Sequence, residues 1–87
     1  MVDPRRADVT ARLARIEGHL HAIHRMVDQD RSYTEIVQQI TAVRSSLAAV
    51  LHVIVDDLVD EFVRSSGAKA APESTVRELR DVVARAL

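Results

Sequence analysis

One row of apolar residues between positions 33 and 64 most constrains how this chain can fold. Its members recur in alternating steps of four and three residues: Ile36, Ile40, Val43, Leu47, Val50 and Ile54. This spacing puts side chains on one face of an α-helix. A second apolar row widens the face toward the C-terminal half: Val37, Leu51, Val55, Leu58, Val59 and Phe62. The sequence therefore predicts a long helix over about 33–64 that needs more than one neighbouring helix to cover it.

The segment before this helix carries a matching apolar row. Its members keep the same alternating spacing: Val9, Leu13, Ile16, Leu20, Ile23 and Val27. Asp3 followed by Pro4 is a typical helix start, so a first helix is expected over about 4–28. Gly18 interrupts it at a cost of about 1 kcal/mol relative to Ala, which suggests close approach of another backbone, with a tolerated accident as the alternative.

The connections between helices are predicted from turn and capping residues. Only a few residues follow position 28 before the next helix, which predicts an antiparallel hairpin, and Ser32 with Glu35 fits a capping box. Residues 65–73 are small and turn-rich, which is typical of a linker. Ser74 or Thr75 would then cap a third helix over about 75–86. The predicted fold class is all-α, with a long antiparallel hairpin plus a short C-terminal helix, in a single domain over residues 1–87.

Composition sets limits on assembly and location. The chain is 47% hydrophobic with one Phe, one Tyr and no Trp, so its core must be aliphatic. Because this supply exceeds what one thin hairpin can bury, we expect a homo-oligomer. Cysteine is absent, which excludes disulfides and thiolate metal ligands. No apolar run approaches a membrane span and the N-terminus is charged, so we expect a cytoplasmic protein without a membrane partner.

The distribution of charge leaves two interpretations open. The net charge of −1 argues against a nucleic-acid partner. Five arginines nevertheless lie in the first segment: Arg5, Arg6, Arg12, Arg15 and Arg25. Acidic residues gather instead in one short stretch of the second helix: Asp56, Asp57, Asp60 and Glu61. Either a dipolar molecule binds DNA with its basic face, or these charges only solvate the helices.

Candidate residues for catalysis or metal binding are few. His21 and His24 are one helical turn apart, a spacing that can chelate a metal, and His52 lies on the second helix. A pair without a third ligand is a weak signal, so packed or solvated histidines are the favoured interpretation. No nucleophile is accompanied by a positioned base. We therefore expect no enzyme and no catalytic residue.

Three segments of the first two helices resemble one known family. They read RLARIEGH from Arg12, IHRMV from Ile23 and QITAVRSSL from Gln39. This pattern is similar to the CsoR/RcnR family of small metal-sensitive repressors, and the stretch from Val76 to Leu79 resembles the family's third helix. The resemblance implies a dimer whose hairpins form a four-helix bundle, a dimer of dimers, and operator DNA that is released when an effector binds.

The resemblance also implies roles for particular residues. Arg12 matches a DNA-contacting position of the family, and Arg15 lies one turn away on the same helical surface, so both are expected to touch phosphate. Weaker candidates for DNA contact are Arg5, Arg6 and Arg44. Glu78 matches a position that couples the effector site to DNA release in copper sensors.

The metal ligands of the family are not carried over. Copper sensors use a Cys near the start of the second helix and a His and a Cys near its end, and these positions align with Tyr33, Leu58 and Phe62. A protonated phenol binds metal poorly and the other two side chains have no donor atom, so we expect them to fill the site with apolar bulk. No cofactor is expected, although family members bind copper(I), nickel or cobalt.

Three functional hypotheses follow. The favoured one is a DNA-binding repressor that has lost or replaced its metal site. The second is a metal sensor with a relocated site built from His21, His24 and either carboxylates or His52. The third is a helical interaction module that does not bind DNA.

Overall fold

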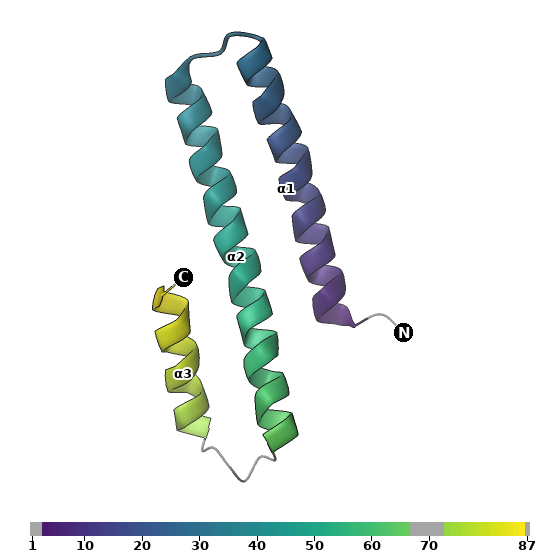
Figure 1. The fold of residues 1–87 in the computed structure, drawn as a ribbon, viewed down its shortest axis with the longest axis vertical. Helices are drawn as coiled ribbons and strands as arrows, with labels where there is room; N and C mark the ends of the chain where they lie inside the picture. Colours follow the sequence, from purple (N-terminus) through teal and green to yellow (C-terminus); the bar gives the residue numbers. More distant parts are fainter. Residues whose placement is uncertain (1–2, 67–72, 87) are drawn as a thin grey trace. The chain divides into compact units, whose positions relative to one another are not determined.

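The computed structural model describes residues 3–66 and 73–86, and every element in them is an α-helix. Helix α1 spans Pro4–Asp28, α2 spans Tyr33–Ser66 and α3 spans Glu73–Ala86 (Figure 1). The prediction of an all-α fold with three helices is confirmed. Within the described residues, no helix is both long and apolar enough to cross a membrane.

The chain divides into two compact units, Met1–Val50 and Leu51–Leu87. Helix α2 contributes to both of them. The first unit is the helical hairpin made by α1 and the first half of α2, which run antiparallel (Figure 1). The second unit contains the rest of α2 together with α3.

Two helix boundaries differ from those expected. Helix α2 continues through Ser65 and Ser66, and the Ser65 hydroxyl donates to the Phe62 carbonyl oxygen at 3.2 Å, a bond that serine can make inside a helix. Helix α3 already begins at Glu73, so Ser74 and Thr75 lie inside its first turn and the prediction that either caps it is wrong. The rest of the expected linker lies outside the described residues.

The predicted start of α1 is confirmed in detail. The Asp3 carboxylate accepts a hydrogen bond from the Arg5 backbone N–H at 2.9 Å, and Pro4 is the first helical residue. The carboxylate satisfies one of the free N–H groups at the helix terminus, and proline has no N–H to leave unpaired.

The turn between α1 and α2 closes as a Schellman motif. The Arg31 N–H donates to the Met26 carbonyl oxygen at 2.9 Å, and the Asp30 N–H donates to that of Val27 at 3.1 Å. Asp30 takes the left-handed conformation, with φ of 57°, that this motif requires. Helices that end in this motif usually have glycine at that position, because a Cβ is disfavoured in the left-handed conformation.

We expect Asp30→Gly to raise the free energy of unfolding by about 0.5–1 kcal/mol, since glycine adopts a positive φ without steric cost. Urea denaturation followed by circular dichroism measures this change. Asp30→Ala is the matched control and should lower stability instead, because alanine carries a Cβ and no side-chain acceptor. A loss of stability in Asp30→Gly would mean that the Asp30 side chain matters more than its backbone conformation.

The capping box expected at the start of α2 is half present. The Ser32 hydroxyl accepts from the Glu35 N–H at 3.3 Å, as predicted. The Glu35 carboxylate instead receives a hydrogen bond from Arg31 Nε at 2.8 Å. Both contacts fix the direction in which the chain enters α2.

Only every second member of each apolar row is buried in the hairpin. The core residues, each 4–7% exposed, are Ile16, Ile23, Ile36, Val43 and Val50. The intervening members are 39–51% exposed: Leu13, Leu20, Val27, Ile40 and Leu47. Each helix of the hairpin buries only one side of the other helix's apolar row. The other side stays exposed, because each row is wider than the surface that one neighbouring helix can cover.

Gly18 does not mark a close contact within the chain. A Cβ built on it would meet no atom within 4 Å. The expectation of close backbone approach is therefore wrong for contacts with the described residues of the first unit.

In the second unit, α3 packs on α2 through an apolar contact and an ion-pair group. Val59 is 7% exposed, and Val76 and Val83 of α3 are partly buried. Arg80 of α3 pairs with the carboxylate of Asp60. A helix of this length is marginal alone in water, so these contacts stabilise it.

Candidate functional site

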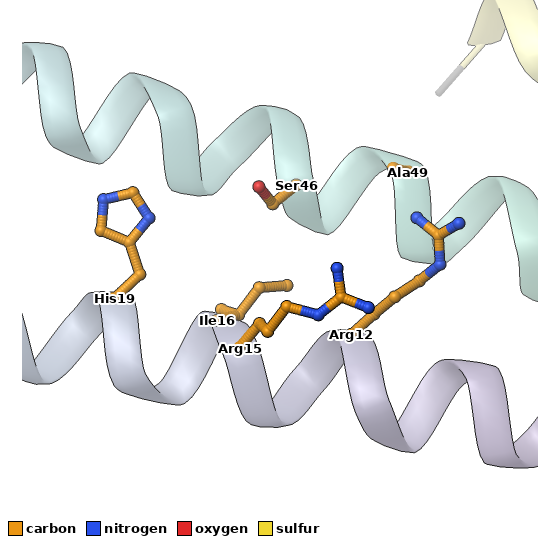
Figure 2. Close-up of a pocket in the computed structure, with 6 residues that line it drawn as sticks. All are labelled: Arg12, Arg15, Ile16, His19, Ser46 and Ala49. Carbon is orange, nitrogen blue, oxygen red and sulfur yellow. The ribbon is translucent and has the colours of Figure 1, made fainter.

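The basic face of the first unit contains a shallow pocket between α1 and α2. Its volume is about 190 Å³. Four residues of α1 and two of α2 line it: Arg12, Arg15, Ile16, His19, Ser46 and Ala49 (Figure 2). The two arginines and the histidine reach the pocket together because positions three, four and seven apart share one helical face. The structure thus brings together the two arginines singled out in the sequence.

The arginines differ in their partners. Arg12 Nε donates to Asp8 Oδ1 at 3.1 Å, with the two side chains 40% and 45% exposed. This intrahelical pair holds the Arg12 stem while its terminal nitrogens remain available. Arg15 makes no hydrogen bond or ion pair with any of the described residues. An exposed guanidinium of this kind is suited to bidentate contact with phosphate or carboxylate.

His19 joins the pocket from one turn further along α1. Its Nε2 donates to Gln39 Oε1 of α2 at 2.7 Å, a hydrogen bond between the two helices of the hairpin. Sequence reasoning counted His19 among the candidate histidines but did not associate it with Arg12 and Arg15. Its place four residues after Arg15 and seven after Arg12 was the signal that would have found it.

The weaker DNA candidates lie elsewhere on the first unit. Arg6 and Arg44 are exposed, and Arg5 is partly buried near the start of α1. None of the three lines the pocket. They remain candidates for contacts outside it.

The histidines of the alternative metal site do not form a cluster. His21 and His24 are exposed on α1, and His24 Nε2 lies 4.0 Å from Asp28 Oδ2. His52 belongs to the second unit and lies beside Asp56 in a different pocket. No group of three or more His, Asp or Glu side chains among residues 3–66 and 73–86 is placed to hold a metal ion.

The positions aligned with the family's metal ligands lie on the surface of this chain. Tyr33 is 83% exposed in the first unit, and Leu58 and Phe62 are each 59% exposed in the second. One chain therefore does not bury these side chains, and the expectation that they fill an apolar site stays a prediction. Their chemistry still offers no thiolate or imidazole to a metal.

The charged contact between α2 and α3 is made by Arg80 and not by Glu78. Arg80 Nε lies 3.6 Å from Asp56 Oδ1, in addition to the pairing with Asp60. Glu78 is exposed, two positions away. Asp56 and Asp60 are four residues apart, hence on one face of α2, and this spacing was a signal for a cationic partner that sequence reasoning missed.

Comparison with known proteins gives a family. The model of the family described as metal-sensitive transcriptional repressor matches residues 5–85. The chain is 34% identical over 74 residues to the copper-sensing transcriptional repressor CsoR of Bacillus subtilis (strain 168), covering 85% of this chain and 73% of the relative. It is 33% identical over 61 residues to the copper-sensing transcriptional repressor RicR of Mycobacterium tuberculosis (strain ATCC 25618 / H37Rv), covering 70% and 64%.

No solved structure matches the chain significantly. The two relatives are transcriptional repressors and not enzymes. The family match covers all three helices, and the pattern predicted from the first two helices agrees with it. The chain belongs to the family of metal-sensitive transcriptional repressors.

Proposed function

We propose that this protein is a DNA-binding transcriptional repressor whose inherited metal site is lost or replaced. The observation that carries the DNA-binding part is the pocket with Arg12 and Arg15 on one face of α1. The Arg15 guanidinium has no partner among the described residues. An unpaired guanidinium beside a second one is the arrangement that binds backbone phosphates.

Loss of the metal site is supported by the side chains present. The sequence has no Cys, and copper(I) is selected by soft thiolate and thioether ligands. The aligned positions hold Tyr33, Leu58 and Phe62. A relocated histidine site is less favoured, because the described residues place no third ligand beside His21 and His24. An interaction module without DNA binding is less favoured because both relatives are named as repressors.

Self-association is the second part of the proposal. Five apolar side chains of the hairpin, all members of the two apolar rows, are each 39–51% exposed: Leu13, Leu20, Val27, Ile40 and Leu47. Exposed apolar surface of this kind is a common sign of an interface. We propose a homodimer whose hairpins cover each other's exposed apolar residues in a four-helix bundle, and a homotetramer as the DNA-binding form. Its site of action would be the cytoplasm, where the repressor would meet its operator.

Glu78 on α3 is the one residue proposed to couple effector binding to DNA release. Glu78 keeps the identity expected from the family pattern, but none of the described residues pairs with it. Arg80 provides the charged contact between α3 and α2 instead. A coupling role for Glu78 therefore requires a partner from outside the described residues of one chain.

Replacing both Arg12 and Arg15 with Ala should weaken binding to the DNA upstream of the protein's own gene and flatten its salt dependence. Each lost phosphate contact lowers the slope of log K against log[salt] by about one unit. Fluorescence anisotropy at several salt concentrations measures both quantities.

Arg25→Ala is the matched control, since Arg25 is exposed on the same helix and does not line the pocket. It should leave the slope nearly unchanged. Equal affinity and equal slope in the double variant and the wild type would move the DNA contacts to another face. No binding by the wild type at any salt concentration would remove the proposed function altogether.

A further inference from the structure

We propose that the pocket between α1 and α2 is a binding site for one phosphate group, with His19 as a ligand beside Arg12 and Arg15. The inference deepens the proposed function, and it rests on that function if the bound phosphate belongs to DNA. The phosphate belongs either to the DNA backbone or to a free phosphate-bearing molecule that competes with DNA.

The pocket has the size and floor that such a group needs. Its volume is about 190 Å³, whereas one water molecule takes about 30 Å³ of the liquid, so a group of five non-hydrogen atoms fits. The floor includes Ile16, which is 6% exposed. An apolar floor lowers the local dielectric and strengthens electrostatic attraction to the charged rim.

The donors around the pocket suit an anion with several oxygens. Arg15 has no competing partner among the described residues, and Asp8 occupies only the Nε of Arg12. Each guanidinium therefore presents terminal N–H groups that can bind two oxygens in parallel. A phosphate group offers acceptors in several directions, so it can accept hydrogen bonds from more than one of these side chains.

His19 is oriented for this role by the second helix. Gln39 Oε1 occupies its Nε2 at 2.7 Å, which leaves Nδ1 as the ring nitrogen for a ligand. When both ring nitrogens carry a proton, Nδ1–H is a hydrogen-bond donor to an anion. Ser46 donates its hydroxyl to the Ala42 carbonyl oxygen at 3.1 Å, so it bounds the site without acting as an anion donor.

Ala49 provides a test that leaves every charge in place. Its small side chain borders the pocket on the α2 side (Figure 2), so Ala49→Gln should fill the space with a side chain that a helix tolerates. Arg15→Gln and His19→Ala remove individual donors. Arg25→Gln and His21→Ala are the matched controls, since both residues are exposed on α1 and neither lines the pocket.

The first measurement uses the full chain and inorganic phosphate as the probe. Phosphate is titrated against chloride at equal ionic strength and pH, and NMR follows the Arg Nε–H and His ring signals. We expect saturable shifts at Arg12, Arg15 and His19, with affinity lowered about tenfold or more in Arg15→Gln and in Ala49→Gln. The two controls should bind phosphate like the wild type, and circular dichroism checks that each variant is folded.

The second measurement separates the two sources. Binding of the upstream DNA is measured for His19→Ala, Ala49→Gln and their controls, with and without phosphate. Weaker DNA binding in both pocket variants assigns the site to a backbone phosphate, whether or not free phosphate also binds. Unchanged DNA binding together with phosphate-specific shifts assigns it to a free phosphate-bearing molecule.

The two proposals fail in different ways. Phosphate-specific shifts in a protein that does not bind DNA would refute the proposed function, but the proposal that the pocket binds phosphate would stand. The phosphate site would be overturned if DNA affinity were unchanged in the pocket variants and phosphate gave no specific shifts. Shifts count as non-specific if they are no larger than those with chloride, or if both Arg15→Gln and Ala49→Gln retain them. This result would leave the repressor proposal standing. Absence of both phosphate binding and DNA binding would overturn both.

Discussion

Replacing Leu20 and Leu47 with Glu should abolish self-association of this protein at micromolar concentration. The two side chains are 49% and 42% exposed in the single chain, so charge there costs the isolated hairpin little. In an interface between two copies, each leucine would contribute about 1.5–3 kcal/mol through burial. A twofold axis uses each position twice, so the double variant should weaken the dimer by roughly four orders of magnitude or more.

Light scattering and sedimentation velocity measure the change. The wild type is expected to be a dimer or a tetramer with no folded monomer at micromolar concentration. Gln38→Glu is the control, because it adds the same charge to an exposed polar position of α2. A wild-type protein that is a folded monomer would contradict the prediction, and so would a double variant that associates as strongly as the wild type.

The triple variant Tyr33→Cys, Leu58→His, Phe62→Cys should gain tight copper(I) binding that the wild type lacks. These substitutions restore the ligand types that the family pattern places at the aligned positions, and thiolates are the ligands that copper(I) prefers. We expect an increase in affinity of at least about a hundredfold, since even outer-shell partners of a metal site contribute 10- to 100-fold. Competition with a copper(I) chelator measures the affinity.

The control for the triple variant carries Ser in place of each introduced Cys. It keeps the shape and the histidine but has no thiolate, so it should bind copper(I) as weakly as the wild type. If the cysteine variant also fails to bind, then Tyr33, Leu58 and Phe62 are not the positions of the inherited site. If the wild type already binds as tightly, then copper(I) has a site elsewhere in the protein.

The sequence predicted the helices because their signals are local. Asp3 and Pro4 specify the start of α1 because one can cap the helix and the other can occupy its first position. The Asp3 side chain makes the expected cap. The apolar rows predicted the long helices and the hairpin from spacing alone. Their burial could not be predicted, because period determines which side chains share a face but not how much of that face one neighbour covers. Leu20 and Leu47 are exposed for that reason.

Contacts between helices required the structure. The hydrogen bond of His19 with Gln39 depends on the register of two helices, which no local pattern encodes. The pairing of Arg80 with Asp60 depends in the same way on how α3 packs on α2. Arg12 and Arg15 could be predicted to lie together, because both belong to one helix and are one turn apart.

The spacing of apolar residues also did not predict that the chain divides into two units. Tyr33 belongs to the first unit and Leu58 to the second, although both lie on α2. The expectation of a single domain over residues 1–87 stays a prediction. The family alignment supplied these positions, and their exposure in the structure shows only that one chain does not bury them.

The central claim, a DNA-binding repressor without the inherited metal site, is tested most directly by one paired titration. Copper(I) and nickel(II) are each titrated into the purified protein against a competing chelator, while anisotropy follows its binding to the DNA upstream of its own gene. A lost site predicts salt-sensitive DNA binding, no tight metal uptake, and a DNA affinity that neither metal changes. Stoichiometric, high-affinity uptake that releases the DNA would contradict it and assign the sensor to His21, His24 and His52.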